Sequence, residues 1–123
     1  MLFAHRPGVA GQSTLYGKAN SLQKVYTDYL QSHQLAKFAH GGVGHLVGLN
    51  VHDGGETPAA FTAPLVPGNV FNIEPRIYLP DEKVGIAIED TFWIDPDGKL
   101  VNLTAGLPVE PEDIERVMAG AKK

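Results

Sequence analysis

Three side chains from separate segments of the chain could together hold a metal ion. They are His45 in a glycine-rich stretch, Glu74 in one alternating segment and Glu89 in the next. One imidazole and two carboxylates suit a divalent ion such as manganese, iron, cobalt or zinc. Because the spacing alone does not bring three distant residues together, this interpretation depends on the elements that position them.

Each of the three residues also has an ordinary structural interpretation. A histidine in a glycine-rich turn is often only a hydrogen-bonding group, and a glutamate on the polar face of a strand is usually solvated. Glu74 has a further alternative, because Arg76 stands two residues along the same face and could pair with it. The residue types alone leave these alternatives open.

Two segments with strand-like alternation carry the two glutamates. From Val70 to Leu79 one face is apolar and the other carries Glu74 among polar neighbours. From Val84 to Ile94 the face that holds Glu89 is lined by small residues, which leaves room for a ligand. We therefore expect both glutamates on strands.

Other signals predict the elements around these strands. An apolar stripe at helical spacing predicts a helix, with Asn20 as its N-cap; its members are Leu22, Val25, Tyr26, Tyr29 and Leu30. Residues 6–12 read as a turn. The turn at 95–98 predicts a hairpin with a return strand over 99–103. A last helix is expected from Pro111, a favoured first helical position, with the apolar stripe Ile114, Val117 and Met118.

Three motifs resemble the metal-ligand segments of Xaa-Pro peptidases such as aminopeptidase P and prolidase, which belong to the pita-bread metallopeptidase family M24. GHLVGLNVHD (44–53) resembles the histidine segment, GNVFNIEP (68–75) the Glu-Pro strand and GIAIED (85–90) the final Glu-Asp strand. RPGV (6–9) resembles the turn that precedes them. The motifs occur in family order, and the resemblance extends over about residues 4–105.

The resemblance implies a hydrolase that cleaves peptides with proline in the second position. In that family two divalent ions, often manganese, cobalt or zinc, polarise the scissile carbonyl and activate water. The mapping implies that His45 binds one metal, that Glu89 bridges the two metals, and that Glu74 is both a ligand and the general base. His52, seven residues after His45, would contact the substrate or leaving group and shuttle a proton.

The chain also departs from the family pattern. The family's two aspartate ligands precede its Arg-Pro-Gly turn, whereas the one carboxylate before His45 here is Asp28, on the polar side of a predicted helix. A family histidine is replaced by Gly41, and the nearby His40 is displaced by one residue. Arg76 stands where the family usually has glycine, and we expect it to crowd the site.

The expected fold class is α+β, as half of a pita-bread fold with a curved antiparallel sheet and helices on one face. Residues 1–123 would form a single domain, the C-terminal half of a metallopeptidase catalytic domain. The implied function is that of a metal-dependent Xaa-Pro dipeptidase or aminopeptidase that lacks two aspartate ligands and is inactive as an isolated chain. The alternatives are a degenerate, non-catalytic fold-half that serves as an oligomerising or interaction module, and a fragment without a separate function.

Composition limits the partners that we expect. The net charge of −4 and the pI near 5.6 argue against nucleic acid and anionic membranes. The absence of cysteine excludes disulfides and thiolate sites. No apolar run approaches the roughly 20 residues that cross a bilayer, and no secretory signal is evident, so we expect a cytoplasmic protein.

A half-domain would leave a sheet edge and an apolar seam exposed, and both favour association. We therefore expect a homo-oligomer or a partner chain that supplies the missing half. A peptide would be the substrate if the site is active.

Overall fold

The computed structural model describes residues 13–17, 19–54 and 57–121, which form five strands, three α-helices and one short 3-10 helix. In chain order the elements are α1 (Leu22–Ser32), η1 (Ala36–Phe38), α2 (Pro58–Thr62), β1 (Val70–Ile73), β2 (Arg76–Leu79), β3 (Val84–Ala87), β4 (Asp90–Ile94), β5 (Leu100–Asn102) and α3 (Pro111–Gly120). The predicted turn over 6–12 lies outside the described residues.

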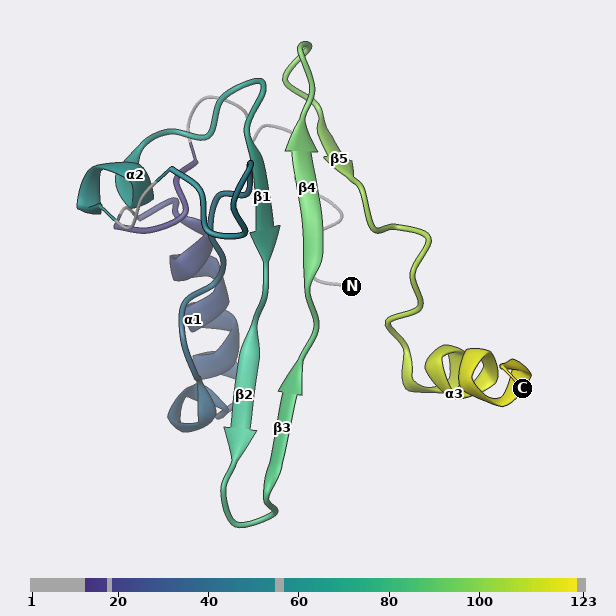
Figure 1. Ribbon diagram of the computed structural model, residues 1–123. Coiled ribbons are helices and arrows are strands. Elements are labelled where there is room, and N and C mark those ends of the chain that lie inside the picture. The colour runs from purple at the N-terminus through teal and green to yellow at the C-terminus, as the bar shows by residue number, and fades with distance from the viewer. Residues whose placement is uncertain (1–12, 18, 55–56, 122–123) are drawn as a thin grey trace.

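Two small antiparallel sheets make the fold a mixed α+β arrangement. One sheet has the strand order β1-β4-β5 and the other pairs β2 with β3. The chain runs from β1 into β2 and from β3 into β4, so the sheets follow one another along a single ribbon (Figure 1). Ile73 pairs with Asp90 and Arg76 with Ala87, so the register is the same in both sheets.

The prediction of two continuous strands is wrong at their centres. Residues 74–75 and 88–89 lie between the two sheets and belong to neither ladder. Pro75 has no N–H to donate, which disfavours strand pairing at this point. By the shared register Glu74 lies opposite Glu89, and two like charges in that relation also weaken the pairing.

Helix α1 begins one residue later than the sequence predicts. Ser21, not Asn20, is the N-cap, and its hydroxyl accepts the backbone N–H of Lys24 at 3.2 Å. Tyr26 and Leu30 of the expected stripe are buried, whereas Val25 is exposed. The helix therefore buries a narrower face than the full stripe.

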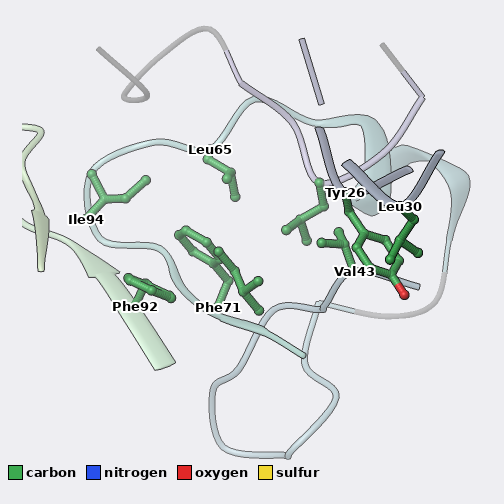
Figure 2. Packing of buried hydrophobic residues seen from close by; sticks show 9 residues of the cluster. Tyr26, Leu30, Val43, Leu65, Phe71, Phe92 and Ile94 are labelled. Carbon is green, nitrogen blue, oxygen red and sulfur yellow. The ribbon is translucent and has the colours of Figure 1, made fainter. Parts of the chain in front are cut away.

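The hydrophobic core lies between α1 and the first sheet. Figure 2 shows Phe71 of β1 between Phe92 of β4 and the group formed by Tyr26, Leu30 and Val43. The rings of Phe71 and Phe92 stack with 5.9 Å between their centroids. This packing anchors the strands that lead to both glutamates.

A second segment lies along the other edge of β1. The backbone amides of Asn72 and Glu74 donate to the carbonyls of His45 and Val43, at 3.0 and 2.8 Å. β1 is therefore flanked by residues 43–47 on one side and by β4 on the other.

The predicted strand and helix at the C-terminal end are present, but α3 does not pack as expected. The return strand β5 and the start of α3 at Pro111 are confirmed. Ile114, Val117 and Met118 are exposed, and within the described residues α3 contacts no other helix or strand. The expectation of helices on one face thus holds for α1, beside β1 and β2, and is wrong for α3 (Figure 1). The described helices are all too short or too polar to cross a membrane.

Candidate metal centre

The structure brings His45, Glu74 and Glu89 together. One ligand atom from each residue lies within 4.8 Å of the other two. His45 Nε2 and Glu74 Oε1 are 3.9 Å apart, and these two side chains expose only 11% and 17% of their surface. Glu89 is exposed, so the group is open to solvent on its side.

Gly44 makes the position of His45 possible. A Cβ atom at residue 44 would lie 2.0 Å from the carbonyl oxygen of Asn72, which is backbone and has little freedom to move. Only glycine therefore lets the histidine segment approach β1 this closely.

The two glutamates meet at the interruption of the ribbon. Glu74 follows β1 and Glu89 precedes β4, and their shared register sets them opposite each other. The interruption is thus the feature that brings two carboxylates next to one imidazole.

Hydrogen bonds fix the ring of His45. Its Nδ1 lies 3.0 Å from the carbonyl oxygen of Leu46, and its Nε2 lies 2.9 Å from Asn72 Nδ2. With the hydrogen on Nδ1 donated to that carbonyl, Nε2 carries the lone pair and accepts from Asn72.

Asn72 is a residue of this site that the sequence analysis did not identify. Its side chain is buried, with 1% of the residue exposed, and it donates to both His45 Nε2 and Glu89 Oε1. A usable signal was present, because asparagine is disfavoured within strands and Asn72 shares a face with Glu74.

Arg76 pairs with Glu74, which is the structural alternative that the sequence left open for this glutamate. Its guanidinium lies 3.2 Å from Glu74 Oε1. One of its nitrogens, Nε, is buried and has no hydrogen-bond partner.

Other predicted residues lie beside the group or away from it. The His52 ring lies 4.0 Å from that of His45, centroid to centroid, on an exposed side chain, and its catalytic role stays a prediction. His40 is exposed and is not a member of the group. Asp28 lies on α1, where it pairs with Lys24 at 2.5 Å.

The donor set fits a single divalent cation in type and nearly in spacing. Ligand atoms bound at about 2.0–2.2 Å lie at most roughly 4.4 Å apart. The 3.9 Å between His45 and Glu74 meets this limit, and the 4.8 Å span of the whole group needs a small closure. Within the described residues this is the one such group, and Asn72 and Arg76 point N–H donors at its members.

Sequence comparison relates the chain to known peptidases. Residues 5–96 match the profile of metallopeptidase family M24. The human protein Xaa-Pro aminopeptidase 3 is 36% identical over 94 residues, which cover 69% of this chain and 18% of that protein. Xaa-Pro aminopeptidase of Escherichia coli strain K12 is 40% identical over 94 residues, covering 70% of this chain and 21% of that one.

Solved structures give the same relationship. Zn-substituted E. coli aminopeptidase P in complex with product superposes with a TM-score of 0.61 at 34% identity, covering 78% of this chain and 24% of that chain. Aminopeptidase P from E. coli with the inhibitor Pro-Leu gives 0.60 at 34% identity, with 76% and 23% covered. The chain thus spans about a fifth of the length of the curated relatives it matches.

Proposed function

Because this chain belongs to metallopeptidase family M24, we propose that it forms the C-terminal half of a pita-bread catalytic domain of the Xaa-Pro aminopeptidase or dipeptidase type. The observation that carries the proposal is the convergence of His45, Glu74 and Glu89 within 4.8 Å. The likeness to a Zn-substituted aminopeptidase P, at 34% identity, supports the same assignment.

We assign each residue a role toward a peptide with proline in its second position. His45 and the two glutamates hold a divalent cation such as manganese, cobalt or zinc, which when bound polarises the carbonyl and activates water. Glu74 accepts the proton of the attacking water as the general base. His52, exposed beside His45, passes a proton to the leaving amine.

The site needs further anionic ligands to support two-metal chemistry. No aspartate of the described residues joins the group, and Asp28 pairs with Lys24 on α1. We propose that these ligands come from a partner polypeptide or from a second copy of the chain. Exposed apolar residues on and beside β3, Val84, Ile86 and Ile88, would provide the contact surface.

A second candidate function is favoured by the contacts of Arg76. Its guanidinium already pairs with Glu74, which a metal would otherwise use. That pairing suits a non-catalytic fold-half that keeps the architecture and serves as an interaction module.

Hydrolysis of an Xaa-Pro dipeptide with added Mn(II) or Co(II) separates the two candidates. We expect no turnover by the chain alone, because it lacks two anionic ligands. We expect turnover when the chain is mixed with a separately expressed polypeptide that carries the family's aspartate-bearing half. Glu89→Ala should abolish that turnover, and Asp28→Ala, on the exposed surface of α1, should not.

The outcomes of this assay are distinct. Turnover by the isolated chain that Glu89→Ala abolishes would contradict the need for a partner. A folded mixture that shows no turnover would favour the interaction module.

Metal binding can be tested without any turnover. We expect calorimetry with Mn(II) or Zn(II) to show weak binding that His45→Ala reduces further. His33→Ala is the matched control, since His33 is an exposed histidine at the end of α1. Equal binding by the two variants would show that the assigned ligand set is wrong.

A further inference from the structure

We propose that the N–H donors of Asn72 and Arg76 restrain the three candidate ligands of the metal centre and compete with a metal ion for them. A metal ion must then displace these donors in order to bind. This inference rests on the metal site proposed above, and it concerns two residues with no assigned role in that site.

The orientation of the Asn72 side chain follows from its backbone neighbour. Its Oδ1 accepts the backbone N–H of His45 at 3.0 Å. A backbone N–H is only a donor, so the amide oxygen must face it and the NH₂ group must point the other way. The amide is 1% exposed, so water does not replace these contacts.

The NH₂ group of Asn72 donates hydrogen bonds to two of the three candidate ligands. It donates to His45 Nε2 at 2.9 Å and to Glu89 Oε1. Because His45 Nδ1 is engaged with the Leu46 carbonyl at 3.0 Å, Nε2 carries the lone pair that a metal would use. Asn72 therefore holds the metal-binding electron pair of His45 and one oxygen of Glu89.

Arg76 donates to the third candidate ligand, Glu74. Its guanidinium donates to Glu74 Oε1 at 3.2 Å. Gly41 makes room for it, since a Cβ atom there would lie 2.9 Å from Nη2. The backbone of Arg76 is held as well, because its carbonyl accepts the Tyr26 hydroxyl at 2.7 Å and the N–H of His40 at 3.1 Å.

These donors oppose a cation. An amide NH₂ and a guanidinium both present positive hydrogens to the space between the ligands. A divalent ion in that space must break three hydrogen bonds and approach a fixed positive charge. Removal of either donor should therefore raise the affinity for metal.

Two substitutions test this directly. Asn72→Asp keeps an oxygen for the N–H of His45 and replaces the NH₂ group with an anionic ligand of nearly the same size. Arg76→Gln removes the guanidinium charge from Glu74 at a partly exposed position. If the buried Asn72 variant does not fold, the Arg76 variant still provides the test.

Matched controls make the same chemical changes elsewhere. Asn69→Asp alters a turn in which Asn69 Oδ1 accepts the N–H of Val66. Arg116→Gln removes an exposed guanidinium that pairs with Asp113 on α3. Neither control residue belongs to the metal group.

The measurement is calorimetry with ZnCl₂ and MnCl₂, combined with nitrogen NMR of the His45 ring. We expect each site variant to bind metal roughly tenfold more tightly than the wild-type chain, because a donor that competes with the metal is removed; substitutions beside metal ligands typically change affinity by about this much, usually as a loss. The controls should match the wild type. In the wild type, the Nε2 resonance should stay unchanged at Zn(II) concentrations that move it in Asn72→Asp.

The results that would overturn the inference also separate it from the proposed function. Tight binding by the wild-type chain that neither substitution improves would overturn the inference and leave the metal site intact. Absence of binding in every folded variant would overturn both.

Discussion

The hydroxyl of Tyr26 ties helix α1 to the strand that carries Arg76. It donates to the Arg76 carbonyl at 2.7 Å, and the residue is only 4% exposed. Burial raises the pKa of Tyr26 above its ordinary 10.0, and the nearby Arg76 charge lowers it by a smaller amount. The folded state therefore prefers the protonated phenol.

This preference predicts alkaline sensitivity. The unfolded chain ionises Tyr26 near pH 10.0, before the folded chain does, so this contribution to stability is complete below that pH and is lost as the pH rises through the folded pKa. Tyr26→Phe should lower the free energy of unfolding by about 1 kcal/mol at neutral pH, because one hydrogen bond is lost. It should also remove this part of the alkaline decline.

Urea unfolding at pH 8 and at pH 11 would measure both effects. Tyr78→Phe is the control, because Tyr78 is 51% exposed. Equal loss of stability between the two pH values in wild type and Tyr26→Phe would contradict the prediction.

For single residues, the sequence predicted the candidate ligands that the structure brings together, but not their neighbours. Type and resemblance pointed to His45, Glu74 and Glu89, and period-two alternation allowed a contact between Arg76 and Glu74. The residue type could mark Asn72 as unusual for a strand, but its contacts depend on a segment far away in the chain that lies along β1, and no local pattern predicts those contacts.

The docking of residues 43–47 on β1 depends on Gly44. Gly44→Ala should lower the free energy of unfolding by about 1–3 kcal/mol, because the added methyl group meets the Asn72 carbonyl at 2.0 Å and the segment must move. Gly106→Ala, where a Cβ atom would meet nothing within 4 Å, should change it by about 0.5 kcal/mol or less. Urea denaturation of both variants checks the difference, and equal stabilities would mean that the segment is not docked.

For helices and strands, the sequence predicted element boundaries correctly where turn and proline preferences determine them. The hairpin turn at 95–98 and the start of α3 follow from turn and proline preferences, and the structure confirms both. The short helix α2, which begins at Pro58 with Thr57 as its N-cap, was not predicted. The breaks in the long strands escaped prediction because alternation continues through Pro75.

Much apolar surface of the whole chain lies open to solvent. Ile86 and Ile88 are 47% and 42% exposed, and Val117 and Met118 of α3 are 58% and 72% exposed. Isolated exposed side chains are ordinary, but a run of them on an edge strand such as β3 favours association.

We expect the chain to associate at micromolar concentration. Light scattering should give a mass above the 13.2 kDa of one chain. The double substitution Ile86→Lys and Ile88→Lys should lower that mass by placing charges in the contact surface. Leu49→Lys, at a fully exposed loop position, is the control and should leave it unchanged. A wild-type chain that scatters as a monomer would contradict this prediction.

At the scale of the whole molecule, the sequence predicted the α+β class and the family motifs. It did not predict that α3 would be separate from the other elements. An apolar stripe on a helix indicates that this face favours burial, but it does not identify the surface that would bury it. The residues that would contact the apolar face of α3 lie in another segment, so the α3 sequence carries no information about them.

The break in the ribbon at Glu74 and Glu89 has one more consequence. It divides the backbone ladder into a core-anchored portion, β1 with β4, and a distal portion, β2 with β3, whose β3 residues are all exposed. Strand β3 can therefore fray without melting the core, whereas β2 is held by the hydrogen bonds of Tyr26 and His40 to the Arg76 carbonyl. A cation bound by both Glu74 and Glu89 would hold the two strands together at the break. Binding of a metal ion should therefore make β3 open less often.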